Sequence, residues 1–134
     1  MMDATDERIL AILKADGRKA FVDIAKELNL TEGAIRARVH KLVSDKTIER
    51  FTIDTREDVK AIVMVATSRS VPTSDIARQI KELGVEHVYE VSGNYDIFCL
   101  VASDSINNTN SIIETIRKLE GVEDTSTTIV LKND

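Results

Sequence analysis

The spacing of apolar residues along the chain changes near residue 58. Before that point, apolar residues recur every three or four positions, which is typical of amphipathic helices. After it, short apolar runs alternate with short helical patterns. The sequence therefore predicts two domains, a helical one over residues 1–53 and a mixed one over residues 61–134. The polar stretch between them, residues 54–60 (DTREDVK), is the expected linker.

The first half predicts three helices, over about Thr5–Gly17, Ala20–Leu28 and Glu32–Ser44. Thr5 is the expected N-cap of the first helix, and Gly17 is expected to end it. In the turn before the third helix, Asn29 tolerates the left-handed conformation and Thr31 can cap the helix that follows. Residues 47–53 (TIERFTI) alternate roughly and include β-branched side chains, so they predict a short strand or wing.

The second half predicts the order β-α-β-β-α-β. The expected strands cover Ala61–Val65, Val85–Ser92, Ile97–Ala102 and Val122–Leu131, and the expected helices cover Thr73–Leu83 and Asn107–Leu119. Gly84 and Gly121 follow the two helices and are expected to stop them. This order is typical of a ferredoxin-like sheet with two helices on one face. The predicted fold class is thus α+β.

The third helix combines an apolar stripe with a basic opposite face. Advancing roughly 100° per residue, we expect Ile35, Val39, Leu42 and Val43 to face the core, as Ile24 and either Val22 or Phe21 do in the second helix. Gly33, Ala37 and His40 then point outward. From Gly33 to Ser44 the helix carries three Lys/Arg and no acid. Lys46 and Arg50 extend the positive charge into the expected wing.

Two helices joined by a three-residue turn, with the second helix basic, favour a helix-turn-helix that binds duplex DNA. Small side chains let a helix approach the major groove, and basic ones reach phosphates or guanine edges. The candidate DNA-contacting residues are Thr31, Gly33, Arg36, Ala37, Arg38, His40, Lys41, Lys46 and Arg50. Arg38 leans toward the core side, where it can instead pair with an acid of a neighbouring helix. The alternative is that these charges only keep a surface helix soluble.

Composition excludes several classes of protein function. The chain has 134 residues and a formal charge of −5, which excludes a wholly basic coat protein but not a local basic patch. The chain has one cysteine, Cys99, and so cannot form an internal disulfide. Together with the two histidines it is too few for a four-ligand Cys/His zinc site within one chain. Apolar runs reach six residues, as in Ala61–Ala66, too few for a membrane span.

The start MMDATDER lacks the features of a secretory signal, so we expect a cytoplasmic protein. No catalytic motif is present, and we expect neither an enzyme nor a bound cofactor.

Three segments carry a resemblance to a known family: DERILAILKADGRKAFVDIAKELNLTEGAIRARVHKL, VYEVSGNYDIFCLV and LEGVEDTSTTIVL. On these residues the sequence resembles the Lrp/AsnC family of leucine-responsive, or feast/famine, transcriptional regulators. The resemblance implies an N-terminal winged helix-turn-helix and a C-terminal RAM/ACT-like domain that binds an amino acid and forms the oligomer. It also implies a homodimer that assembles further, often to an octamer, on operator DNA. Lys46 stands where this family commonly has a glycine.

The turn around Gly93 is the candidate effector site. An amino acid needs a carboxylate for its ammonium group, accessible backbone and small polar side chains. Gly93, Asn94, Tyr95 and Asp96 supply these at one turn, and Thr125 and Thr127 add hydroxyls from the last strand. The resemblance places the family's effector pocket at the same turn. Alternatively, Gly93 and Asn94 form only a hairpin turn, Asp96 caps it, and the threonines are strand surface.

Two other functions remain open on sequence grounds. Sirohaem decarboxylases share the fold of this family and use histidines on a tetrapyrrole, but this chain has few histidines and a basic third helix. A DNA-free module that senses an amino acid for some enzyme would need the second half alone. Glu86 and Glu90, near the candidate turn in sequence, favour a basic effector such as lysine or arginine.

Overall fold

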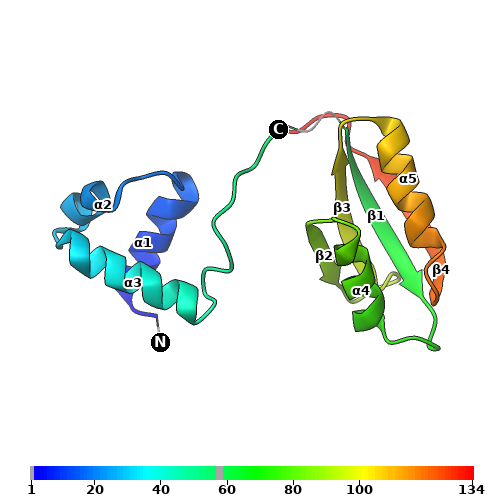
Figure 1. Ribbon diagram of the computed structural model, residues 1–134, viewed down its shortest axis with the longest axis horizontal. Helices are drawn as coiled ribbons and strands as arrows, with labels where there is room; N and C mark the ends of the chain where they lie inside the picture. The colour runs from blue at the N-terminus through cyan, green and yellow to red at the C-terminus, as the bar shows by residue number, and fades with distance from the viewer. Residues whose placement is uncertain (1, 57–58) are drawn as a thin grey trace. The chain divides into compact units, whose positions relative to one another are not determined.

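The computed structural model describes residues 2–56 and 59–134. The chain divides into two compact units, residues 1–55 and residues 56–134, which are seen in Figure 1. Residues 57 and 58 of the expected linker lie outside the described residues. Each unit has its own hydrophobic core.

Three helices form the N-terminal unit: α1 (Ala4–Ala15), α2 (Phe21–Leu28) and α3 (Glu32–Ser44). Their core is built from fully buried isoleucines, one from each helix, at Ile9, Ile24 and Ile35. Phe21 packs against this core, whereas Val22 is exposed, which settles the choice between them. The bounds of α3 agree with the prediction, because its cap and apolar stripe are local signals.

The ends of α1 differ from the prediction. Asp3, not Thr5, is the N-cap, and it forms a capping box with Asp6. The Asp3 carboxylate accepts from the Asp6 N–H at 2.9 Å, and the Asp6 carboxylate accepts from the Asp3 N–H at 3.1 Å. This reciprocal arrangement satisfies two free backbone donors, whereas Thr5 would satisfy one. At the other end Asp16, not Gly17, is the C-cap.

The turn from α2 to α3 has the predicted chemistry. Asn29 adopts the left-handed conformation with φ of 56°, and its N–H donates to the Ala25 and Lys26 carbonyls. Thr31 then caps α3, since its side-chain oxygen accepts from the Ala34 N–H at 3.1 Å. These two residues fix the sharp change of direction that a helix-turn-helix requires.

The expected wing is not formed. Within the described residues 47–56 there is no strand. Ile48 packs against the core and its N–H donates to the Leu42 carbonyl at 2.9 Å, but Phe51 and Ile53 beyond it are 56% and 75% exposed. A strand needs a neighbouring strand to satisfy its backbone groups, and the described part of this chain offers residues 47–56 none.

The C-terminal unit has the predicted βαββαβ order. Its elements are β1 (Val59–Thr67), α4 (Thr73–Glu82), β2 (His87–Glu90), β3 (Ile97–Ser103), α5 (Ile106–Arg117) and β4 (Val122–Ile129). The strands form one sheet in the order β2-β3-β1-β4, and neighbouring strands are antiparallel. β2 is shorter than predicted, because the chain leaves the sheet after Glu90 to form the turn around Gly93.

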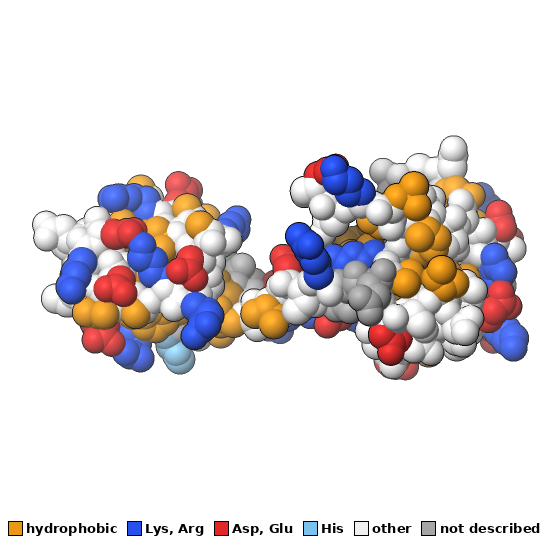
Figure 2. All heavy atoms as spheres, turned by 90° about the horizontal axis from the view of Figure 1, so that it is seen from above, with side chains coloured by type: hydrophobic (Ala, Val, Ile, Leu, Met, Phe, Trp, Pro, Cys, Tyr) orange, Lys and Arg blue, Asp and Glu red, His pale blue; other side chains and the backbone are white. Residues whose placement is uncertain are grey.

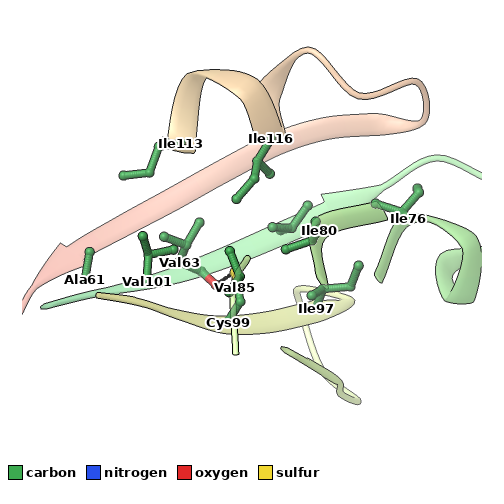
Figure 3. Packing of buried hydrophobic residues seen from close by; sticks show 11 residues of the cluster. Ala61, Val63, Ile76, Ile80, Val85, Ile97, Cys99, Val101, Ile113 and Ile116 are labelled. Carbon is green, nitrogen blue, oxygen red and sulfur yellow. Dashed lines mark hydrogen bonds between the residues drawn. The ribbon is translucent and has the colours of Figure 1, made fainter. Parts of the chain in front are cut away.

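Strand alternation divides the sheet into a covered and an open face. Val63 on β1 is paired with Cys99 on β3, and both side chains are fully buried under the helices. Figure 3 shows them with the other buried hydrophobic residues of this cluster. Isoleucines of α4 and α5 complete this core. The next residues along the strands, such as the pair Met64 and Phe98, point to the opposite face and are only half-buried.

Cys99 is a structural residue, as its place in an apolar strand suggested. It is fully buried, and its thiol donates to the Val63 carbonyl at 3.5 Å. Burial disfavours the thiolate and raises the pKa of Cys99 to about 11. The thiol is therefore a poor nucleophile in the folded protein.

Candidate DNA-binding helix and effector site

The outward face of α3 has the predicted composition. Ile35, Val39 and Leu42 are buried, while Gly33, Ala37, His40 and Lys41 are exposed. Val43 is exposed as well, so its assignment to the apolar stripe was wrong; it lies one residue past Leu42 and rotates off the core side. Small side chains thus alternate with basic ones along one exposed side of the helix.

Gly33 is not required by packing inside the chain. A Cβ built at Gly33 would meet no atom of the described residues within 4 Å. Glycine within a helix weakens it relative to alanine. The small size of this residue therefore serves no contact within the N-terminal unit as described.

Arg36 is held on the surface of α3. Its Nη2 donates to the carboxylate of Glu32 one turn earlier, and its Cζ lies 5.4 Å from the centroid of the Phe21 ring. The side chain is nevertheless 64% exposed. On the face seen in Figure 2, basic and acidic side chains are interspersed over the N-terminal unit.

Arg38 joins α3 to the start of α1. Its Nη1 donates to both carboxylate oxygens of Asp3, at 2.9 and 2.7 Å, and to Asp6 at 3.0 Å. The hydrogen bond from Arg38, followed by that from the Asp6 backbone, lowers the pKa of Asp3 to about 2. The same contacts raise the pKa of Arg38. This confirms the interpretation that Arg38 pairs with acids of a neighbouring helix.

Lys46 follows the C-cap of α3 in an unusual conformation. Its φ is 62°, and its N–H donates to the Val43 carbonyl at 3.1 Å. A left-handed residue after a helix is most often glycine. This explains why the family that the sequence resembles commonly has glycine at this position. Arg50 lies four residues further and is exposed.

The turn between β2 and β3 is closed by the Val91 N–H, which donates to the Asp96 carbonyl at 2.9 Å. Gly93 has φ of 130°, and Gly93 and Asn94 are exposed while Tyr95 is half-buried. A side chain at Gly93 would be strained by this backbone, although a Cβ there meets no described atom within 4 Å. Sequence alone could anticipate this turn from Gly93-Asn94.

Asp96 also binds the end of β1. Its N–H donates to the Val65 carbonyl at 2.9 Å, and its Oδ2 accepts from the Thr67 N–H at 2.8 Å. The carboxylate therefore stabilises the end of a strand that lies 29 residues earlier in the chain, a partner that sequence spacing could not identify.

The two threonines lie on β4 beside β1. Thr125 is opposite Val65, on the helix-covered face, and its Oγ1 accepts from Arg117 Nε at 2.9 Å. Thr127 is opposite Val63 and is exposed. Asp96 and Thr125 thus flank the same end of β1 from opposite sides, and Thr127 lies two residues further along β4.

Glu90 ends β2 next to the candidate turn, while Glu86 precedes β2 at its other end. Residues 87–89 separate the two glutamates, so their carboxylates lie at opposite ends of β2 and only Glu90 adjoins the turn.

The described residues contain neither a metal-binding cluster nor a membrane-spanning helix. Among them, no group of three or more His, Cys, Asp or Glu is placed to hold a metal ion. In the same part of the chain, no helix has both the length and the apolar character that crossing a membrane requires.

Similarity to known proteins extends over both units. Residues 2–43 match the family model of the AsnC-type helix-turn-helix domain, and residues 60–133 match that of the Lrp/AsnC ligand-binding domain. The HTH-type transcriptional regulator LysM of Sulfurisphaera tokodaii is 43% identical, with 98% of this chain and 96% of that protein aligned. The LysM of Saccharolobus solfataricus is 42% identical, with 98% and 94% aligned.

Solved structures agree with these matches. E. coli AsnC is 26% identical with a TM-score of 0.71, over 99% of this chain and 94% of that chain. A feast or famine regulatory protein of M. tuberculosis complexed with L-methionine has the same fold, with 24% identity and a TM-score of 0.85 over 99% and 94% of the two chains. The sirohaem-decarboxylase and DNA-free alternatives lose their support, because the relatives that align with 98% of this chain at 43% and 42% identity are transcriptional regulators. The chain belongs to the Lrp/AsnC family of transcriptional regulators, and it is not an enzyme.

Proposed function

We propose that this regulator binds operator DNA with the exposed side of α3 that carries Gly33, Ala37, His40 and Lys41. The observation that carries the proposal is the exposed Gly33, whose small size no described neighbour within the chain requires. A helix without side chains at that point can approach the floor of a major groove. Thr31, at the start of the same helix, lies where HTH proteins commonly contact bases and phosphates.

The cations around α3 fall into two groups. Arg36 and Arg38 are ion-paired with carboxylates of their own unit. By contrast, no carboxylate of the described residues lies within ion-pair distance of Lys41, Lys46 or Arg50. These three are available to neutralise DNA phosphates, whereas we assign Arg38 to holding α3 against α1 rather than to DNA contact.

Salt-dependent binding tests this assignment. The double variant Lys41→Ala/Arg50→Ala should weaken binding to the protein's own promoter region, and the slope of log affinity against log salt should fall by roughly 0.9 for each phosphate that the variant no longer neutralises. Arg8→Ala/Lys14→Ala removes the same charges from exposed positions of α1 and serves as the control. An unchanged slope in the first variant, or an equal weakening in the second, would contradict the proposal.

The protein acts as a homodimer, which presents two α3 helices to the DNA and can assemble further toward an octamer. The support is the open face of the sheet, where apolar residues on adjacent strands are half-buried in the single chain. Tyr89 on this face is 6.5 Å from His87 and 6.2 Å from Phe98, ring centroid to centroid. A second copy can cover this surface with the same surface of its own. Binding to genomic DNA agrees with the cytoplasmic location predicted from the sequence.

The effector is an amino acid that binds at the end of the sheet formed by Gly93, Asn94, Tyr95 and Asp96, with Thr125 and Thr127 from β4. The match to a ligand-binding domain supports this, as does the relative solved with L-methionine. Gly93 leaves the backbone of the turn accessible. Asp96 uses Oδ2 for Thr67 and keeps Oδ1 for an ammonium group.

A thermal-shift screen against the twenty amino acids tests the effector proposal, since a ligand of the native state raises its stability with ligand excess. One or more amino acids should raise the melting temperature, and Asn94→Ala should reduce that shift. Asn110→Ala, at an exposed asparagine of α5, is the control and should keep the shift. Asp96→Ala is a poor choice, because it also removes the contact to Thr67. An Asn94→Ala protein with the full shift would contradict the site.

A further inference from the structure

Two neighbours fix the position of Arg36 on the exposed side of α3. Glu32 accepts a hydrogen bond from Nη2, and the Phe21 ring lies 5.4 Å from Cζ. Phe21 is the first residue of α2 and packs against the core of the N-terminal unit, so its ring is a fixed platform. The guanidinium is thus held at the surface by contacts from two different helices.

This restraint matters because a free surface arginine samples many rotamers, and binding a target then costs the entropy of ordering them. A guanidinium carries five N–H donors. The contact to Glu32 uses Nη2, so donors remain for another partner while the plane stays oriented. The guanine edge in the major groove offers two acceptors, O6 and N7, which match the arginine fork.

The charge of Arg36 is largely cancelled by Glu32. Arg36 therefore adds little to the long-range attraction between the protein and phosphates, which depends on uncompensated charge. Lys41, Lys46 and Arg50 differ, since no carboxylate of the described residues is within ion-pair distance of them. A paired arginine is better suited to a directional contact than to general attraction.

We infer that Arg36 reads a guanine of the operator and that Glu32 and Phe21 are its positioning residues. The inference rests on the proposed contact between α3 and DNA. It separates two tasks on one helix surface. The unpaired cations supply affinity that depends on salt and not on sequence, and Arg36 supplies discrimination at one base pair.

The experiment begins with selection of preferred sites from a pool of DNA duplexes with a randomised core. Binding of the full chain is then measured on the best site, on the same site with single base-pair changes, and on random duplex. The wild-type protein should require guanine at one position of each half-site. Arg36→Lys keeps the charge but loses the fork, so its preference for that guanine should fall about tenfold while binding to random duplex is unchanged.

The positioning residues have their own signatures. Glu32→Gln should also lower the preference for guanine, but it should strengthen binding to random duplex and steepen the salt slope by roughly 0.9, because a charge is uncovered. Phe21→Leu should lower the preference without altering the salt slope, and its thermal unfolding is measured alongside because Phe21 packs on the core. Glu7→Gln removes an equivalent acid from the first turn of α1 and should change none of these quantities.

Each opposing result has a definite meaning. If Glu32→Gln strengthens binding to all sequences equally and keeps the preference for guanine, then Glu32 only repels phosphate and the inference is wrong. If Arg36→Ala weakens binding to the operator and to random duplex equally, Arg36 contacts phosphate and does not recognise a base. In both cases the proposed function stands. A wild-type protein that binds no duplex at low salt would refute the proposed function itself, and this inference with it.

Discussion

Lys46 has an unfavourable backbone conformation for a residue with a side chain, since φ of 62° costs an L-residue about 1 kcal/mol. Glycine would avoid that cost, yet a lysine stands there, beside the helix proposed to contact DNA. Residues held in sparsely populated conformations cluster at functional sites. A lysine at this position is consistent with the DNA contact proposed for Lys46.

Exchange of Lys46 separates stability from binding. Lys46→Gly should raise the free energy of unfolding by about 0.5 kcal/mol, the conformational gain being partly offset by the greater freedom of glycine in the unfolded chain. The same variant should bind DNA more weakly and with a shallower salt slope. Urea denaturation and a titration with promoter DNA measure the two effects, and Lys46→Arg is the control that keeps the charge. Undiminished DNA binding by Lys46→Gly would remove Lys46 from the contact set.

The contact of Arg38 with Asp3 makes the stability of the N-terminal unit depend on pH. The pKa of Asp3 is lowered from 3.8 to about 2, so folding favours its charged form. This stabilisation is complete above pH 4 and is lost as the pH falls from about 4 to about 2. Asp3→Asn should thus lower the free energy of unfolding at pH 7 and flatten its decline over that range.

Denaturation with urea at a series of pH values between 7 and 2 measures this dependence. Asp54→Asn, which alters an exposed aspartate after the helices, is the matched control and should retain the wild-type decline. Parallel curves for Asp3→Asn and the wild-type protein would show that the ion pair seen between α1 and α3 does not contribute in solution.

At the scale of elements, local signals were sufficient where an element is defined by its own residues. The bounds of α3 follow from Thr31 and the period of Ile35, Val39 and Leu42, and the same period predicted which side is exposed. The start of α1 could not be predicted in this way. Asp3 and Thr5 can both cap a helix, and the capping aspartate is held by Arg38, 35 residues further along the chain.

The same distinction applies to the candidate site. The turn at Gly93 could be predicted from the sequence. The contacts of Asp96 with Thr67 and of Arg36 with Phe21 could not, because each joins residues that belong to different elements. The missing wing has a related cause. The alternation in residues 47–53 describes a segment suited to a strand, but pairing depends on a neighbour that the pattern does not contain.

At the scale of the whole molecule, the sheet of the C-terminal unit is covered on one face by α4 and α5 and is open on the other. Met64 and Phe98 are paired at the centre of the open face. Their half-burial in a single chain leaves apolar surface that a second copy can cover. The proposed dimer thus depends on this face, and DNA binding by two α3 helices depends on the dimer.

A charge on the open face should separate the subunits. Phe98→Lys should raise the dimer dissociation constant at least about tenfold, because a lysine would have to be buried without a partner. Sedimentation equilibrium measures the change. Ile106→Lys, at an exposed apolar residue that begins α5, is the control and should stay dimeric. A Phe98→Lys protein with the wild-type dissociation constant would show that the subunits meet elsewhere.

Cys99 gives the molecule a reporter for one of its halves. The sequence has a single cysteine, and that thiol is enclosed in the core of the C-terminal unit. A thiol-specific reagent can reach it only when that core opens, so the labelling rate follows the opening of the ligand-binding half and is blind to the helical half. Pulse labelling of the unaltered 134-residue chain therefore distinguishes a ligand that stabilises the C-terminal unit from one that acts on the DNA-binding unit.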